Sequence, residues 1–464
     1  MKIENNMATD VKIAYIGGGS RGWAWGLMSD LASSEGMSGD VYLYDIDLDA
    51  AKANEIIGNK YNDLPDAVSK WGYHAVETID EALTGANFVV ISILPGTFDE
   101  MESDVHAPEK YGIYQPVGDT TGPGGVVRAL RTIPMFEVIA KAIAKNCPDA
   151  WVINYTNPMA ICVNTLYKTF PGIKAFGCCH EVFGTQSLLG IALKEATGIE
   201  AKRDEITVNV VGVNHFTWLT SARYKNIDLF PIYREFCEKH YDDAAGKAAD
   251  DNWANKQWQT TNKVKKDLFL RYGVIAAAGD RHLAEFCEKE WYLKDVEMVE
   301  KKWHFGLTAV KWRKQDMEGR LAKSKRLISG EQAIELKKTG EEGVRQMKAL
   351  LGLGDLVTNI NLPNVGQIPN LPLGVVVETN AGFRADSATP GMAGAIPERI
   401  YPLIARNAGA QAQVVKAGIE RNLDLAFDAF CNDPLVDIPV ADARVLFIEM
   451  IENTKKYLDM YEIK

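Results

Sequence analysis

The glycine pattern G-x-G-x-x-G at Gly17, Gly19 and Gly22 limits the possible folds more than any other feature of this sequence. It follows a short apolar run, residues 12–16, that is typical of a strand buried on both faces, and it precedes a predicted helix near residues 21–35. In that context the first glycine permits a tight turn, the second lets a pyrophosphate approach the backbone, and the third lets the helix pack on the strand. The pattern therefore predicts a dinucleotide-binding site.

The neighbouring residues agree with this prediction. Gly18 and Ser20 keep the loop small, and Asp45 ends the second predicted strand, where a carboxylate can accept hydrogen bonds from the adenosine ribose. Because a carboxylate repels a 2′-phosphate, NAD is favoured over NADP. Ser92 and Pro95 follow the fourth predicted strand and are expected to line the crevice where the strand order reverses. A tight turn that binds nothing is the alternative, but it does not account for the carboxylate.

Strands and helices alternate along the first half of the chain. Predicted helices, notably 128–146 and 185–197, separate short apolar strands. This alternation implies an α/β fold with a doubly wound parallel sheet. The predicted strands are 12–16, 40–46, 74–79, 86–94, 151–156 and 174–178.

The pattern changes after about residue 200. Residues 205–224 are one long β-rich run, which is typical of an antiparallel hairpin, and residues 359–374 are rich in Pro, Gly and Asn and are predicted to be irregular. We therefore expect a dinucleotide-binding domain over residues 1–200 and an α+β domain over 201–464 for substrate, metal and oligomer contacts. Helices are predicted at 281–302, 331–352, 407–430 and 442–458.

Charge, hydropathy and cysteine usage exclude several classes of protein. The net charge of -11 argues against nucleic acid as the main partner. No apolar run approaches the roughly 20 residues needed to cross a bilayer, and the polar start of the chain has no apolar signal core. The 7 cysteines are scattered and odd in number, and a chain of 464 residues needs no disulfides. A reducing cytoplasm is therefore expected.

A second cluster of polar residues follows the last strand of the first half. It contains Cys178, Cys179, His180 and Glu181, and His215 follows within the β-rich run. Ligand sites in open parallel sheets lie at such strand ends. A thiolate and an imidazole from separate segments could share one divalent ion. Free cysteines are commonly buried, however, so spacing alone favours a structural role for the thiols and for His215.

Two further segments are rich in groups that could contact a ligand. Residues 118–125 include Asp119 and several glycines, which let a backbone pass close to a ligand. Residues 271–286 gather many polar side chains between apolar stretches. A surface loop would explain the first segment, and a helix N-terminus capped by Asp280 would explain part of the second.

Together these segments resemble glycoside hydrolase family 4, the NAD- and manganese-dependent glycosidases. The resemblance extends over nearly the whole chain, and it reverses the preference for a structural role of the thiols. It implies a Rossmann domain similar to lactate and malate dehydrogenases, followed by a mixed C-terminal domain. The matching motifs are IGGGS (16–20), GDTTGPGG with RALRTIP (118–125, 128–134), NYTNPMA (154–160), GCCHEV (177–182), GVNHFTW (212–218), GDRHLAEF (279–286), NLPNVGQIPNLP (361–372) and NDPLV (432–436).

The resemblance implies an unusual route to hydrolysis. Most glycosidases use two carboxylates across the scissile bond, but the NAD-dependent family is an exception. NAD⁺ takes a hydride from C3 of the sugar, a base removes the acidified C2 proton, and a metal stabilises the enediolate. The aglycone is then eliminated, water adds, and the hydride returns to C3, so that the net reaction is hydrolysis.

The resemblance also assigns roles to individual residues. Cys179 and His215 match the metal-binding cysteine and histidine of the family. His180 matches a position that serves as the general acid in some members, or it contacts substrate hydroxyls. Asn157 matches the asparagine near the sugar and the nicotinamide, and Asp119 matches an acidic catalytic position of members that act on non-phosphorylated sugars.

Two candidates remain for the base at C2. Several members use a tyrosine in the region of Tyr272, whose phenol could ionise beside a metal, and Asp280 is the competitor. Additional substrate contacts are expected from Glu181, Asn214, Arg281 and His282.

The motif Cys179-His180-Glu181-Val182 resembles the α-galacturonidase group, with α-glucuronidases, α-galactosidases and α-glucosidases as neighbours. A uronate needs a cationic partner, for which Arg281 or Arg271 is the candidate, because a guanidinium can bind a carboxylate through two hydrogen bonds. We therefore expect an exo-acting hydrolase of short α-galacturonides that forms a homodimer or homotetramer and binds neither nucleic acid nor membrane. An NAD-dependent sugar or hydroxy-acid dehydrogenase and a non-catalytic NAD sensor are the alternatives.

Overall fold

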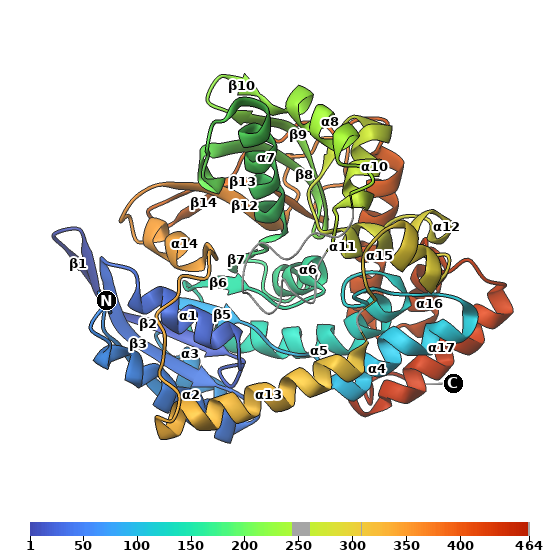
Figure 1. The fold of residues 1–464 in the computed structure, drawn as a ribbon. Helices are drawn as coiled ribbons and strands as arrows, with labels where there is room; N and C mark the ends of the chain where they lie inside the picture. The colour runs from blue at the N-terminus through green and yellow to red at the C-terminus, as the bar shows by residue number, and fades with distance from the viewer. Residues whose placement is uncertain (244–259, 308, 463–464) are drawn as a thin grey trace.

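The structure of the chain is a computed structural model that describes residues 1–243, 260–307 and 309–462. Its N-terminal half forms the predicted doubly wound parallel sheet, and Figure 1 shows helices on both of its faces. The six parallel strands lie in the order β7-β6-β5-β2-β3-β4. Their bounds are β2 (Met7–Ile16), β3 (Met37–Tyr44), β4 (Trp71–Val76), β5 (Phe88–Ile91), β6 (Trp151–Asn154) and β7 (Lys174–Gly177).

These strands are apolar because helices cover both faces of the sheet. In β5 every residue is buried, as the unbroken apolar run predicts. The loops that follow β2, β5, β6 and β7 all lie at the carboxyl edge of the sheet, which is where open α/β sheets bind their ligands. The helices after these strands are α1 (Trp23–Ala32), α2 (Leu48–Lys60), α3 (Ile79–Leu83), α4 (Phe98–His106), α5 (Gly122–Asn146), α6 (Met159–Thr169) and α7 (Glu181–Thr197).

The C-terminal half extends the same sheet. Strand β12 (Leu356–Pro363) pairs antiparallel with β13 (Val376–Arg384), which pairs with β14 (Ser387–Pro390), and Asn361 of β12 is in register with Gly177 of β7. The prediction that residues 359–374 are wholly irregular is therefore wrong for the first five of them. Their asparagines and prolines are typical of loops, but β7 and β13 supply backbone partners that only the folded chain brings into place.

A second sheet carries the predicted antiparallel hairpin. Strand β8 (Ile206–Val213) pairs with β9 (Phe216–Tyr224), and β10 (Ile227–Asp228) and β11 (Ile275–Ala276) also pair with β9. Since Val213 is the partner of Phe216, the hairpin turns on the two residues Asn214 and His215. His215 has a φ of 63°, which is uncommon outside glycine. The confirmed hairpin thus places a strained histidine at its tip.

The helices of the second half differ from the predictions. The expected helix 281–302 is divided into α11 (Asp280–Glu285), α12 (Lys289–Tyr292) and a π-helical turn, and 331–352 contains only α14 (Gly343–Leu350). Helix α13 (Val310–Ser329) was not predicted, because its sequence is largely charged. It packs against α2 and α4, as Figure 1 shows. The remaining helices are α8 (Leu229–Lys239), α10 (Lys263–Tyr272), α15 (Tyr401–Glu420), α16 (Leu423–Cys431) and α17 (Val440–Thr454).

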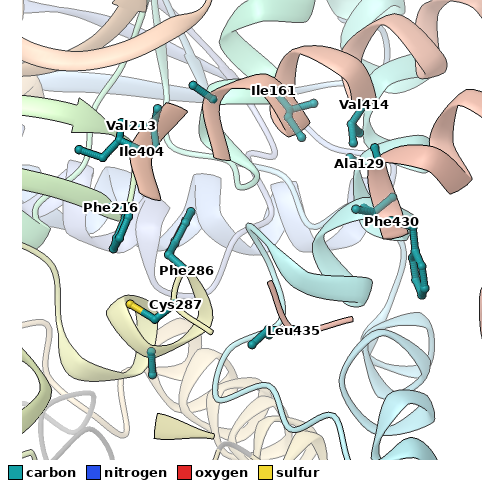
Figure 2. Packing of buried hydrophobic residues seen from close by; sticks show 14 of the residues in the cluster. Ala129, Ile161, Val213, Phe216, Phe286, Cys287, Ile404, Val414, Phe430 and Leu435 are labelled. Carbon is teal, nitrogen blue, oxygen red and sulfur yellow. The ribbon is translucent and has the colours of Figure 1, made fainter. Parts of the chain in front are cut away.

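The largest cluster of buried apolar side chains joins the two halves of the chain. Figure 2 shows α5 and α6 residues packed with the β8–β9 hairpin, the two residues that follow α11 and the C-terminal helices. Within it the rings of Phe216 and Phe286 are stacked with their centroids 5.0 Å apart. Burying one such side chain contributes about 1.5–3 kcal/mol, so this core holds the hairpin and α11 firmly against α5. Among the described residues, no helix is long and apolar enough to cross a membrane.

Candidate active site

Three side chains from separate segments converge beside the carboxyl edge of the large sheet. Asp119 precedes α5, His215 is at the tip of the β8–β9 hairpin, and His282 lies in α11. One ligand-type atom from each lies within 4.8 Å of the other two. The two imidazole rings are buried and stacked, with centroids 3.8 Å apart. Two histidines and a carboxylate form a donor set suited to a divalent metal.

The hydrogen bonds around Asp119 determine which nitrogen of His215 is available. Although burial alone would raise the pKa of Asp119, the electrostatic influence of the two histidines and of Arg128, together with the Thr120 hydrogen bond, lowers it below its usual range. The carboxylate is therefore ionised and can only accept. The Thr120 hydroxyl therefore donates to Asp119 Oδ1 at 2.7 Å. Its oxygen must then accept from His215 Nδ1 at 2.9 Å. Burial, assisted by His282, lowers the pKa of His215 to about 3, so the ring is neutral and Nε2 carries a free lone pair.

His282 has a ring nitrogen without a partner. Its Nδ1 is buried and makes no hydrogen bond within the described residues, while Nε2 lies 3.7 Å from Glu181 Oε1. Glu181, the first residue of α7, accepts a hydrogen bond from Gly279 N at 2.7 Å. Burial opposes the charge of Glu181, but the neighbouring histidines lower its pKa to about 2. An ionised carboxylate behind a histidine is a usual arrangement in metal sites.

Other buried polar atoms near this cluster also lack partners in the described part of the chain. Asn157 Nδ2 donates to Asp119 Oδ2 at 3.3 Å, and Arg128 Nε donates to the carbonyl of Asn157 at 3.2 Å. Each buried polar atom that stays unpaired costs about 1–3 kcal/mol. A ligand that carries several hydroxyls would satisfy them, so the site fits a sugar. The unpaired atoms are Arg128 Nη1, Asn157 Oδ1, Asn214 Oδ1 and His282 Nδ1.

Cys179 lies behind this cluster, next to a glutamate that was not predicted. The thiol is buried near Asn214 and Glu378, and burial raises its pKa well above the usual value. Its sulfur is outside the group formed by Asp119, His215 and His282. Glu378 of β13 accepts from Asn214 Nδ2 at 3.1 Å and from Asn359 Nδ2 at 2.6 Å, and burial raises its pKa to about 7. The sequence signal that could have identified Glu378 is a carboxylate within the apolar run that forms β13.

The glycine loop has no room for side chains. The N–H groups of Gly17 and Gly18 both donate to the carbonyl of Tyr44 at 2.9 Å. At Gly17 a Cβ atom would lie 2.1 Å from the Ser92 carbonyl oxygen, and the φ of this residue is +93°. Asp45 Oδ2 accepts from Gly19 N at 2.8 Å. The structure thus brings together the loop, the carboxylate at the end of β3 and the end of β5.

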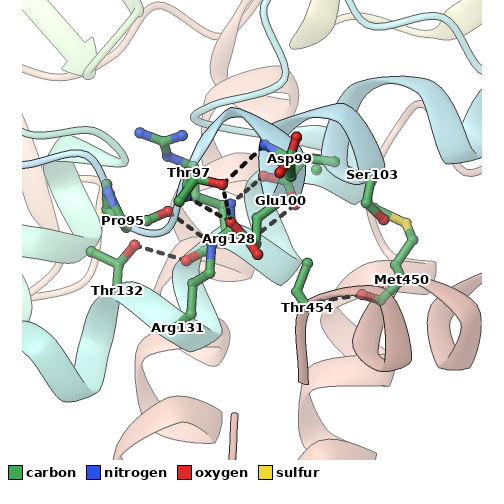
Figure 3. Close-up of polar contacts among 12 residues, drawn as sticks. Pro95, Thr97, Asp99, Glu100, Ser103, Arg128, Arg131, Thr132, Met450 and Thr454 are labelled. Atoms are coloured by element: carbon green, nitrogen blue, oxygen red, sulfur yellow. Dashed lines mark hydrogen bonds and ion pairs between the residues drawn. The ribbon is translucent and has the colours of Figure 1, made fainter. Parts of the chain in front are cut away.

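Buried polar contacts support the segment after β5. Arg131 of α5 donates from Nε to the Pro95 carbonyl at 2.9 Å (Figure 3). It also donates from Nη1 to Asp104 Oδ1 at 3.0 Å, and both charged side chains are fully buried. Thr97 and Glu100 form a capping box that starts α4. These contacts hold the Pro95 carbonyl and the start of α4 against α5, in the segment that follows Ser92.

The structure does not bring every predicted residue to the cluster. Asp280 Oδ1 accepts from Lys265 N at 3.0 Å and its Oδ2 accepts from Thr260 Oγ1 at 2.6 Å, so it anchors the start of α10. The Tyr272 ring packs edge-on against Trp218, with centroids 6.1 Å apart. Arg271 donates to Asp267 at 2.6 Å, on the surface.

His180 and Arg281 flank the cluster. His180 Nδ1 lies 2.9 Å from Glu341 Oε1, on a side chain that is half-exposed beside Trp23. Partial burial opposes its charge, but the Glu341 carboxylate raises the pKa of His180 to about 9. Arg281 is buried, one residue before His282, and donates to the carbonyl of Pro116.

Known proteins resemble this chain along its whole length. The family model described as "Family 4 glycosyl hydrolase" matches residues 12–195, and the model of the "Family 4 glycosyl hydrolase C-terminal domain" matches residues 210–436. A protein named alpha-galacturonidase from Thermoanaerobacterium saccharolyticum is 62% identical over 465 residues, with 100% of each chain covered.

Solved structures show the same fold. The crystal structure of the lplD protein from Bacillus subtilis is 50% identical and superposes with a TM-score of 0.89, covering 95% of this chain and 100% of that chain. A 6-phospho-alpha-glucosidase from gut microorganisms, solved in complex with NAD and Mn²⁺, has a TM-score of 0.78 at 17% identity, covering 97% of this chain and 99% of that chain. The second likeness concerns the fold alone.

Proposed function

The chain belongs to family 4 of the glycosyl hydrolases, and from this premise we propose that it is an exo-acting α-galacturonidase of short α-galacturonides. The full-length similarity to a protein named alpha-galacturonidase supports the substrate. The observation that carries the proposal is the convergence of Asp119, His215 and His282 with unpaired polar atoms of Arg128 and Asn157. This arrangement can bind a cation and several sugar hydroxyls at one place.

We propose that the enzyme uses NAD and a divalent cation, with Mn²⁺ preferred. When they are bound, NAD accepts and returns a hydride at sugar C3, and the cation stabilises negative charge on the neighbouring oxygens. The loop of Gly17, Gly18, Gly19, Ser20 and Gly22 fits a dinucleotide, because side chains there would fill the space that a pyrophosphate needs. Asp45, Ser92 and Pro95 would complete this site.

His215, Asp119 and His282 would hold the cation. The lone pair on His215 Nε2 and the unpartnered Nδ1 of His282 are suited to this role. Cys179 stays in the proposal as a further ligand, because it follows β7 by two residues and contacts Asn214, the neighbour of His215. We expect His282→Asn to weaken Mn²⁺ binding about 10- to 100-fold, measured by electron paramagnetic resonance. Cys179→Ser tests the thiol, with the adjacent buried Cys178→Ser as its control; equal affinities in these two variants would remove Cys179 from the site.

The protein groups have separate tasks in the reaction. Asn157, Asn214 and Glu181 would bind and orient sugar hydroxyls. His180 would hold the proton for the leaving oxygen, because its pairing with Glu341 keeps it charged near neutral pH.

For the base at C2, Asp280 uses both carboxylate oxygens to anchor Thr260 and Lys265. Tyr272 is the other candidate, and it stays in the proposal although its ring packs against Trp218 outside the cluster. Arg281 would bind the uronate, because it is next to His282 in α11, whereas Arg271 lies at the surface beside Asp267.

A substrate panel tests the proposed specificity. The purified chain, supplied with NAD, Mn²⁺ and a reductant, should release 4-nitrophenol from the α-galacturonide faster than from the α-galactoside, α-glucuronide or α-glucoside. Release from the α-galactoside but not from the α-galacturonide would contradict the uronate assignment. Retention of deuterium at sugar C2 through complete hydrolysis in ordinary water would contradict the mechanism.

A dehydrogenase would give a different optical signal. It would accumulate NADH in proportion to product, whereas the proposed hydrolase returns the hydride in every cycle. Constant absorbance at the NADH band during turnover is therefore expected. A non-catalytic NAD sensor would show no cation-dependent release of 4-nitrophenol at all.

The remaining expectations also belong to this proposal. We propose that residues 1–200 bind the dinucleotide, that residues 201–464 add cation, substrate and oligomer contacts to those of Asp119 and Asn157, and that the chain acts as a homodimer or homotetramer. A reducing cytoplasm is proposed because all seven cysteines are free thiols.

A further inference from the structure

A buried glutamate links α11 to the loop that carries Asp119. Glu285, the last residue of α11, is fully buried, and its Oε1 accepts hydrogen bonds from Val117 N at 2.7 Å and Gly118 N at 2.9 Å. These two amides immediately precede Asp119. One turn earlier in the same helix, Arg281 donates to the carbonyl of Pro116. Helix α11 therefore holds three consecutive residues of this loop.

Different side chains hold the two ends of the loop. Gln115 accepts from Gly124 N and donates to the Asp104 carbonyl, both at 3.0 Å. Asp433, from the C-terminal half, accepts from Gly122 N at 2.8 Å and from Thr121 Oγ1 at 3.0 Å. Neither of these contacts reaches the helix that carries His282. The contacts of α11 are the ones that couple Asp119 directly to that helix.

The loop cannot hold this conformation by regular secondary structure. Residues 116–118 lie between elements and are buried, and Gly118 has a φ of +66°. Buried backbone N–H groups need acceptors, and here a side chain provides them. The position of Asp119 relative to His282 therefore depends on the acceptor that Glu285 supplies to Val117 and Gly118.

We propose that Glu285 is a positioning residue that sets the separation between Asp119 and His282, and through Thr120 the tautomer of His215, for cation binding. The inference rests on the proposed function, because it takes the cluster to be the cation site. Glu285 does not touch the cation or the substrate. It acts by fixing the loop to the helix, which keeps the carboxylate and one imidazole in a single rigid unit.

The chemistry of Glu285 points to its acceptor oxygen and not to its charge. Burial raises the pKa of this carboxyl to about 8, so it is largely protonated at neutral pH. A protonated carboxyl still presents one carbonyl oxygen, as does the amide of glutamine. Glu285→Gln should therefore preserve the loop, whereas Glu285→Leu removes the acceptor at similar volume.

Two measurements on the full chain test this role. Hydrogen exchange followed by mass spectrometry reports the protection of the amides of Val117 and Gly118 without any cation. Electron paramagnetic resonance of added Mn²⁺ reports cation affinity. We expect Glu285→Leu to increase the rate of hydrogen exchange in the peptide that contains these amides. The same variant should weaken Mn²⁺ binding about 10- to 100-fold, as loss of groups that orient metal ligands does. Glu285→Gln should resemble wild type in both measurements.

A core variant controls for a general loss of stability. Leu446 is fully buried in α17. Leu446→Ala should lower the melting temperature without a selective effect on the exchange of Val117 and Gly118 or on Mn²⁺ affinity.

Each outcome decides one proposal. Unchanged exchange in Glu285→Leu would overturn the inference, and so would weak Mn²⁺ binding in Glu285→Gln, which remains informative if the leucine variant does not fold. If wild type bound no Mn²⁺, the proposed cation site would fail, and the exchange data would still decide whether Glu285 holds the loop.

Discussion

The glycine loop and the cation cluster lie near the same sheet edge but are built in opposite ways. The loop is one continuous segment, Gly17 to Gly22, in which absent side chains and backbone conformation create the site. The cluster takes Asp119, His215 and His282 from three segments and depends on the contacts that hold them. This difference teaches that a local site is sensitive to added atoms, whereas a composite site is sensitive to lost supports.

The largest effect is expected when the composite site loses a ligand or its ion. Treatment with a chelator, or the variant His215→Ala, should reduce hydrolysis about 1,000-fold or more, because Lewis-acid stabilisation contributes several kcal/mol at about 1.4 kcal/mol per tenfold. Initial rates of 4-nitrophenol release measure this effect. Added Mn²⁺ should restore the activity of the chelator-treated enzyme but not that of His215→Ala. The control His240→Ala removes a partly exposed histidine that pairs with Glu195. Hydrolysis that persisted after chelation would remove the role of the cation.

An added methyl group should damage the local site almost as much. In Gly17→Ala the new Cβ would lie 2.1 Å from the Ser92 carbonyl oxygen, so the loop must shift. We expect turnover at limiting NAD to fall about 100-fold, as displacements of around 1 Å in catalytic sites do. Calorimetric titration with NAD should show the loss of binding.

A second glycine serves as a control that separates backbone strain at positive φ from the steric contact with Ser92. Gly112 has a similar φ of +68° but open space around it. Gly112→Ala should cost only about 1 kcal/mol of stability and leave NAD binding unchanged. If both variants bound NAD equally, the close approach to Ser92 would not matter, and the contrast between the two sites would weaken.

Removing a support of the composite site should have an intermediate effect. Thr120→Val keeps the side-chain volume but removes the hydroxyl that links Asp119 to His215. Mn²⁺ affinity should fall about tenfold, measured by electron paramagnetic resonance. In the control Thr132→Val the lost hydroxyl bonds only to the Arg128 carbonyl of its own helix, so affinity should not change. Equal Mn²⁺ affinities in the two variants would contradict a role of the Thr120 hydroxyl in linking Asp119 to His215.

The smallest effect is expected at the rim of the local site. Asp45→Asn replaces the carboxyl group that accepts from Gly19 N with an amide. NAD affinity should fall about fivefold, which corresponds to about 1 kcal/mol. The ratio of NAD affinity to NADP affinity should also become smaller. Asp47→Asn is the control, because that carboxylate caps α2 through Ala50 N. Tighter discrimination against NADP in Asp45→Asn would contradict the role of the carboxylate.

Several features were accessible from the sequence because they depend on neighbouring residues. The run of residues 12–47 contains a strand, a glycine turn, a helix and Asp45 in continuous order, and each step is dictated by local conformation. The β-rich run 205–224 likewise contains both strands of its hairpin. Strand β12 and helix α13 were missed or misjudged, because partners distant in the chain, and not their own composition, stabilise them.

The sequence by itself determined the parallel α/β sheet and the dinucleotide loop, since these follow from periodicity and spacing. Most polar residues around the site were identified through the resemblance of the sequence to glycoside hydrolase family 4, because spacing alone favoured a structural role for the thiols and His215. Tertiary structure alone decided that His282 stands with Asp119 and His215, that Asp280 is an anchor for α10, and that Glu378 and Glu285 lie buried behind the cluster. The physical reason is that contacts between distant segments depend on how the cores pack, and no local pattern records that packing.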